Sequence, residues 1–209
     1  DGDQSAYNEF RNRDTRLYYT IPPPYKVKMG KTNMLWEYTD DPKDREYIDL
    51  MAILSDDKHK TLPWMNWEGL ILKEEPHYVD FTDGQPYSVS YTGYRFYKFS
   101  NKINRIQNVD INDAPIFRLG EILVSYAEAK YELGEMSQQI IDQTINKLRA
   151  RGGVAPLQLS AIPQDPSRDQ TVDAILWEIR RERAVELMGE GFRFDDLRRW
   201  KKMDYAVAT

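Results

Sequence analysis

The chain contains no cysteine among its 209 residues, and it has two histidines, His59 and His77. The absence of cysteine excludes disulfide bonds, thiolate metal ligands and cysteine nucleophiles within this chain. The two histidines belong to no HExxH or paired-histidine helix pattern, so the sequence predicts no zinc site. The sequence also lacks an apolar run of about 18 residues, so we expect no membrane-spanning helix. We expect neither a metal nor another cofactor.

Basic residues are not in excess: Lys and Arg number 29, Asp and Glu number 34, and the net charge is −5. This balance argues against general affinity for nucleic acid or for an anionic membrane, both of which require a basic surface. A GxSxG motif and a lysine-containing phosphate loop are missing as well. The segment 80–84 (DFTDG) lacks the acidic spacing and the terminal Glu of a calcium loop, so we interpret it as a turn.

The character of the sequence changes near residue 113. Residues 1–112 hold most of the prolines and no long stretch of helical period, so we expect a loop-rich, ligand-facing region with short strands. Residues 113–209 have helical periodicity, and we expect the two regions to form one mainly α structural unit with long irregular loops. Within the first region, extended segments are predicted over 17–21, 70–72 and 94–99, and helical turns near 5–11 and 43–54.

Four helices are predicted in the second region, over residues 114–133, 137–151, 171–188 and 193–202. The first should be capped by Asp113 and should carry Pro115 in its first turn. Its buried stripe is expected to consist of Leu119, Ile122, Leu123, Tyr126, Ala127 and Ala129. The short link between the first two helices favours an antiparallel pair of the TPR type, although no 34-residue repeat is present.

The segment from Arg180 to Trp200 mixes arginines, acids and large apolar residues. A nucleic-acid site would need the basic residues to dominate, and a catalytic carboxylate pair would need acids without arginine partners. We therefore expect a half-buried ionic network, in which Arg193 and Arg198 bind carboxylates such as Glu186 or Asp195. Its predicted members are Arg180, Glu182, Arg183, Glu186, Arg193, Asp195 and Arg198.

Aromatic residues make up 12% of the chain, with 14 Tyr and five Trp. A predicted loop places Trp64 and Trp67 three residues apart, with Asn66 between them. A pyranose ring can stack its C–H face on an aromatic plane while polar side chains bind its hydroxyls, so this loop is a candidate sugar site. The alternative is that both tryptophans anchor the loop to the core. The candidate ligand-binding residues are Trp64, Asn66, Trp67, Tyr78, Tyr91 and Tyr94.

Several stretches resemble the SusD/RagB family of nutrient-binding outer-membrane lipoproteins. They are residues 13–20 (RDTRLYYT), 92–99 (TGYRFYKF), 114–134 (APIFRLGEILVSYAEAKYELG), 145–154 (INKLRARGGV) and 179–200 (IRRERAVELMGEGFRFDDLRRW). The last match is long and specific, whereas Gly120 stands where the family usually has Ala. The chain opens with Asp1 rather than Met, and the resemblance covers the later part of the family pattern, so we expect the N-terminal part of the full protein to be missing.

The resemblance implies a SusD-like helical scaffold, related to TPR-like α-α superhelices, on the extracellular face of the outer membrane. It implies capture of an oligosaccharide without hydrolysis, and partnership with a TonB-dependent, SusC-like transporter. Membrane contact would occur through an upstream lipid anchor that this chain does not contain. A peptide ligand, a helical protein-interaction module and a glycoside hydrolase with paired carboxylates remain the alternatives.

Overall fold

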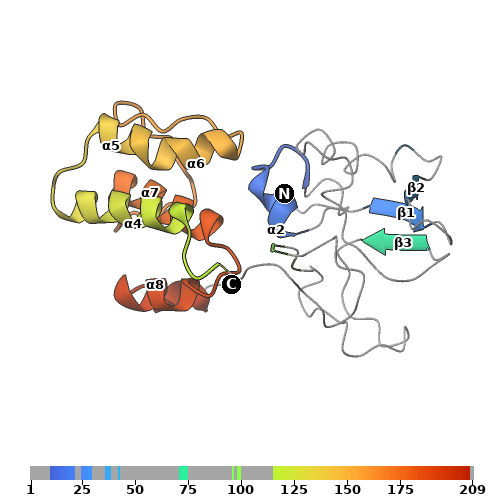
Figure 1. Cartoon of the computed structure of the whole chain (residues 1–209). Helices are drawn as coiled ribbons and strands as arrows, with labels where there is room; N and C mark the ends of the chain where they lie inside the picture. Colours follow the sequence, from blue (N-terminus) through green and yellow to red (C-terminus); the bar gives the residue numbers. More distant parts are fainter. Residues whose placement is uncertain are drawn as a thin grey trace. The chain divides into compact units, whose positions relative to one another are not determined.

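The computed structural model describes residues 10–21, 25–29, 36–38, 42, 71–74, 96, 98–99 and 115–207. The chain divides into two compact units, Asp1–Asp113 and Ala114–Thr209. The described residues are mainly helical, as the sequence predicts (Figure 1). None of the helices in this part of the chain combines the length and the apolar character that crossing a membrane requires.

The first unit contains a short helix, α2 (Arg16–Thr20), and a three-stranded antiparallel sheet. Strand β1 (Tyr25–Met29) is central, between β2 (Trp36–Tyr38) and β3 (Ile71–Glu74). The register pairs Val27 of β1 with Tyr38 of β2 and with Leu72 of β3. The sequence predicts β3 within two residues, while β1 and β2 have no counterpart among the predicted segments.

The extended segment predicted over residues 17–21 is wrong, because this segment forms α2. Asp14 accepts a hydrogen bond from the backbone N–H of Arg16 at 2.9 Å and also binds its guanidinium at 2.6 Å, so it supports the first turn. The buried residues of α2 are Arg16, Tyr18 and Thr20. Burial therefore alternates along the segment, and one short turn of helix has the same apolar pattern as a half-buried strand.

The strand predicted over residues 94–99 is also wrong at its end. Lys98 and Phe99 form a turn, in which Phe99 adopts a φ of 67°. An L-residue with this φ cannot continue a strand. The predicted helical turn near 43–54 lies outside the described residues.

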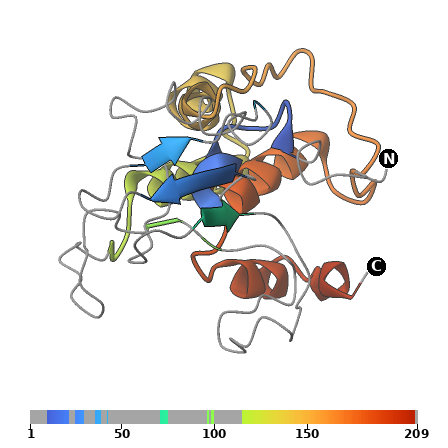
Figure 2. The same cartoon turned by 90° about the vertical axis from the view of Figure 1, so that its right-hand side faces the viewer.

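Residues 115–207 of the second unit form five α-helices and a final 3₁₀ helix. Figure 1 labels the α-helices α4 to α8. They are α4 (Leu119–Glu132), α5 (Gln138–Gln143), α6 (Ile145–Arg151), α7 (Ala174–Glu186), α8 (Arg193–Arg199) and η3 (Met203–Ala206). Helices α4 and α7 pack against each other, and α5 and α6 contact this pair. In both views α5 and α6 lie on one side of the α4–α7 pair and α8 lies on the other (Figures 1 and 2).

The core of this unit lies between α4, α5, α6 and α7. It consists of Val124, Ala127, Ile141, Ile145, Leu148, Leu157, Ile179 and Leu187. Ile141 of α5, and Ile145 and Leu148 of α6, are the core residues that these two helices contribute. The predicted helix over 137–151 is interrupted at Thr144, whose φ of −125° and ψ of −89° lie outside the helical region.

Helix α4 differs most from its prediction. It begins at Leu119 rather than at 114, because the backbone of Arg118 is extended, and Pro115 precedes the helix. The expected stripe is largely wrong, since Leu119 is 70% exposed, and Ile122 and Tyr126 are also exposed. The buried residues are instead Gly120, Val124, Ala127 and Glu128. Two of these four are a glycine and a glutamate, so apolar periodicity alone could not identify this face.

Candidate functional site

A set of buried ion pairs connects the helices of the second unit. Arg149 of α6 is 2% exposed and pairs with Glu178 and, at 3.3 Å, with Glu182, both on α7. The two glutamates are also buried, and they lie one helical turn apart on the same face of α7. One guanidinium thus fixes the register of α6 against α7, because its N–H groups are divided between two carboxylates.

A second group of ion pairs connects α8 to α7 and α4. Arg183 of α7 donates to Asp196 of α8 at 2.7 Å. Glu128 of α4 accepts two hydrogen bonds from Arg199, at 2.8 and 2.5 Å, and a third from the indole N–H of Trp200 at 2.6 Å. These contacts position the short helix α8, which has few apolar residues of its own to bury.

Glu186, at the end of α7, joins two further segments. Its carboxylate pairs with Arg118, just before α4, and with Arg151, at the end of α6. Burial by itself would raise the pKa of Glu186, but hydrogen bonds from Arg151 and Arg118 outweigh it, and the pKa lies below its ordinary value. A Cβ atom on Gly120 would lie 2.4 Å from the Glu186 Oε1, so the absent side chain gives this carboxylate its space.

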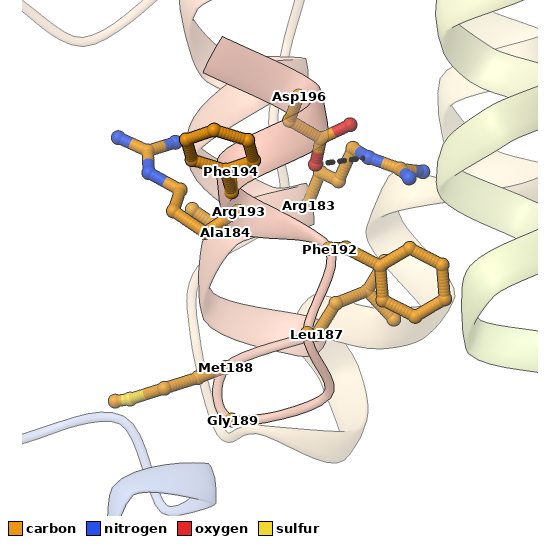
Figure 3. A pocket seen from close by; sticks show the side chains of 10 residues that line it. Arg183, Ala184, Leu187, Met188, Gly189, Phe192, Arg193, Phe194 and Asp196 are labelled. Atoms are coloured by element: carbon orange, nitrogen blue, oxygen red, sulfur yellow. Dashed lines mark hydrogen bonds and ion pairs between the residues drawn. The ribbon is translucent and has the colours of Figure 1, made fainter. Parts of the chain in front are cut away.

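A pocket of about 440 Å³ opens where the chain turns from α7 into α8 (Figure 3). Phe194 and Arg193 lie at one end of it, and Met188 and Gly189 at the other. Gly189 has a φ of 77°, a conformation that glycine adopts without strain. The Phe194 ring is 60% exposed, so the pocket offers an aromatic surface beside a guanidinium. This combination can contact an apolar or a ring-shaped group and a polar group at once.

Of the seven residues predicted to form the ionic network, some lie in buried ion pairs and others are exposed. Glu182, Arg183 and Glu186 belong to the buried pairs described above. Arg180 lies 4.0 Å from Glu128. Asp195 and Arg198 are exposed and 3.8 Å apart, at the periphery of the cluster.

Of the two arginines expected to bind carboxylates such as Glu186 or Asp195, Arg198 lies 3.8 Å from Asp195, whereas no carboxylate pairs with Arg193 among the described residues. The Glu186 carboxylate is bound by Arg118 and Arg151, and the Arg193 guanidinium lies 5.8 Å from the centre of the Trp200 ring. Sequence reasoning missed seven members of the ion pairs described above: Arg118, Glu128, Arg149, Arg151, Glu178, Asp196 and Arg199. Glu178 could have been found, because it continues the spacing of Glu182 and Glu186 along α7.

All six candidate ligand-binding residues (Trp64, Asn66, Trp67, Tyr78, Tyr91 and Tyr94) lie outside the described residues. His59 and His77 lie outside them too. In the part of the chain that the structure describes, no group of three or more His, Asp or Glu residues is arranged to hold a metal ion.

Comparison with known proteins identifies one family. The sequence model of the SusD family matches residues 1–208, which is nearly the whole chain. A search of curated proteins gave no match, and a search of solved structures gave none either. The helical scaffold described above agrees with the helical fold of that family. The chain therefore belongs to the SusD family.

Proposed function

We propose that this protein captures an oligosaccharide or polysaccharide at the bacterial cell surface and presents it, without cleaving it, for uptake through a TonB-dependent transporter. The observation that carries the proposal is the family match over residues 1–208. Members of the SusD family generally bind nutrients, glycans among them, and are typically lipoproteins associated with the outer membrane. We propose the same location for this protein, with a lipid anchor upstream of the present sequence.

The acids of α7 support binding rather than hydrolysis. A glycosidase needs one carboxyl group with a raised pKa as its general acid and a second carboxylate across the scissile bond. Glu186 has a lowered pKa and is held by Arg118 and Arg151. Glu182 is buried against Arg149. The two guanidinium partners stabilise Glu186 in its charged form, so Glu186 is poorly suited to donate a proton.

We place the ligand contacts in the aromatic loop, on Trp64 and Trp67, with Asn66 binding sugar hydroxyls. Tyr78, Tyr91 and Tyr94 follow closely in the sequence and would extend the surface. Tyr and Trp combine a broad apolar face with a polar N–H or O–H, and this suits them to a ring whose faces are apolar and whose edge is hydroxylated. The proposal supplies a reason for two tryptophans three residues apart in a chain that has five.

Native affinity electrophoresis against a panel of polysaccharides tests this function. We expect one glycan to retard the wild-type protein, and the double variant Trp64→Ala/Trp67→Ala to lose the retardation. The matched control is Phe117→Ala/Tyr126→Ala, which removes two exposed aromatic rings from the second unit and should leave the retardation intact.

The alternative outcomes are equally specific. A folded wild-type protein that no glycan retards would contradict glycan capture and favour a peptide ligand or a helical interaction module. Retardation that survives in the tryptophan variant would keep the function and move the site away from the loop. Release of reducing sugar from the retarding glycan would overturn the non-catalytic assignment.

A further inference from the structure

A second, smaller pocket lies between α7, α8 and η3 in the second unit. Its volume is about 130 Å³. Its walls include three arginines, Arg180, Arg181 and Arg193, together with the rings of Trp177, Trp200 and Tyr205. Every charged side chain among these lining residues is therefore basic, although the chain as a whole has a net charge of −5.

Within the described part of the chain, Arg180 has a buried hydrogen-bond donor without an acceptor. Its Nε atom is buried and has no hydrogen-bond partner among the described residues. The nearest carboxylate, Glu128, is 4.0 Å away and already accepts hydrogen bonds from Arg199 and Trp200. Burial lowers the pKa of Arg180, although its charge persists because a guanidinium remains protonated in proteins. The Arg180 Nε lies 4.0 Å from the Glu128 Oε1, too far for a hydrogen bond, so this partly buried guanidinium can still bind a ligand of negative charge.

Arg193 provides a second available guanidinium. Among the described residues no carboxylate pairs with it, and it lies 5.8 Å from the centre of the Trp200 ring. The Arg180 guanidinium lies 4.6 Å from the same ring. A guanidinium that packs against an aromatic face keeps the N–H groups at its edge available for hydrogen bonds. Two such edges beside one pocket can bind the oxygens of a single anion.

The size of the pocket limits the ligand. A water molecule accounts for about 30 Å³ of liquid volume, so a space of about 130 Å³ holds roughly four waters. This is less than the roughly 300 Å³ or more of ordinary small-molecule sites. An oxyanion group fits in it, while the rest of a larger ligand must extend into solvent.

We propose that this pocket binds a single oxyanion group, a carboxylate or a sulfate, between Arg180 and Arg193 with Trp200 as its floor. The bound oxygens provide the hydrogen-bond acceptors that Arg180 lacks. The aromatic rings exclude water from one side of the site, which strengthens the charge-assisted hydrogen bonds. The proposal stands independently of neutral-glycan capture by the aromatic loop.

The indole N–H groups of Trp177 and Trp200 report on this pocket directly. Isotope-labelled protein is titrated with sodium glucuronate, sodium acetate, sodium sulfate and glucose at constant ionic strength in chloride, and the two indole NMR signals are followed. We expect saturable shifts with the oxyanions and none with glucose. Arg193→Gln should weaken binding about tenfold or more, because it removes a charge-assisted hydrogen-bond donor. Arg198→Gln is the control, since it removes an exposed arginine of α8 that does not line the pocket.

Each outcome decides the proposal. The absence of saturable shifts with every oxyanion, shifts of equal size with glucose, or equal weakening by both variants would overturn it. Tighter binding of glucuronate than of acetate would support an acidic saccharide as the source of the oxyanion. Equal binding of the two would support the pocket with a simple carboxylate as its ligand. The protein spectrum of Arg193→Gln, compared with that of Arg198→Gln, verifies that the fold is retained.

Discussion

Individual residues of the second unit bury charge to an unusual degree. Arg149, Glu178 and Glu182 are each less than 5% exposed, and they form one continuous set of ion pairs. Two carboxylates share one guanidinium here, and Arg181 gives Glu178 an additional partner at 2.7 Å. Buried pairs of this kind add little net stability relative to apolar residues, but removing one partner leaves an uncompensated charge in the interior. Such residues therefore act mainly by excluding other helix registers.

The consequence can be measured at Arg149. Arg149→Met keeps much of the side-chain volume but leaves Glu178 and Glu182 without this partner, so we expect the free energy of unfolding to fall by about 3–5 kcal/mol. Urea denaturation followed by circular dichroism measures the change. Arg198→Met is the control: its 3.8 Å pair with Asp195 is exposed, and the expected loss is under about 1 kcal/mol. An equal fall in the free energy of unfolding in the two variants would show that the buried Arg149 ion pairs are worth no more than an exposed pair.

The helices as elements illustrate how far sequence reasoning reaches. Apolar periodicity predicts α4, α7 and α8, and it predicts α5 and α6 as one continuous helix. Apolar periodicity does not predict the buried face of α4. Glu128 is buried there because it accepts hydrogen bonds from Arg199 and Trp200, which lie about seventy positions later in the chain. Periodicity describes an element alone, whereas this face is determined by its partner.

The candidate site could likewise be predicted from the sequence only in part. The sequence pattern identified an Arg- and Glu-rich segment and predicted ion pairs within it, and the structure contains ion pairs of Glu182, Arg183 and Glu186. The pattern could not assign the partners, since Arg149 meets its glutamates across 29 and 33 positions of the chain. The pocket proposed to bind an oxyanion could not be predicted from the sequence for the same reason. Its residues Arg180, Arg193 and Tyr205 come together only through the packing of α7, α8 and η3. The aromatic loop stays a prediction, because its residues lie outside the described part of the chain.

The start of α7 offers a test at the scale of one element. Asp173 precedes the helix and accepts hydrogen bonds from the backbone N–H groups of Ile175 and Leu176, at 2.9 and 3.3 Å. We expect Asp173→Ala to lower the free energy of unfolding by about 1 kcal/mol, because these two donors lose their acceptor. Asp173→Asn keeps an oxygen in the same place, so it should remain close to wild type in the same urea titration. A loss as large in the Asn variant would indicate that charge, rather than capping, is what Asp173 contributes.

At the scale of the whole molecule, the two units differ in how their described residues are stabilised. The described part of the first unit combines the three-stranded sheet with α2, where the Tyr18 hydroxyl donates to the Phe10 carbonyl at 2.5 Å. The second unit has a continuous apolar core, and every residue of that core lies between 124 and 187. Its buried ion pairs likewise join residues between 118 and 199. The core contacts and ion pairs of residues 115–207 described above therefore join residues of the second unit to one another.

Because these core contacts and ion pairs lie within the second unit, we predict that residues 114–209 fold without the rest of the chain. A segment of this size can bury a core of its own, although such small domains are only marginally stable. We expect the isolated segment to show a helical circular dichroism spectrum and a single cooperative urea transition, and Arg149→Met to destabilise it as it does the full chain. The shared response to Arg149→Met matters, because a non-native helical collapse would not depend on one buried guanidinium. A spectrum without helix, or a transition without cooperativity, would mean that the first unit supplies contacts on which the helical core depends.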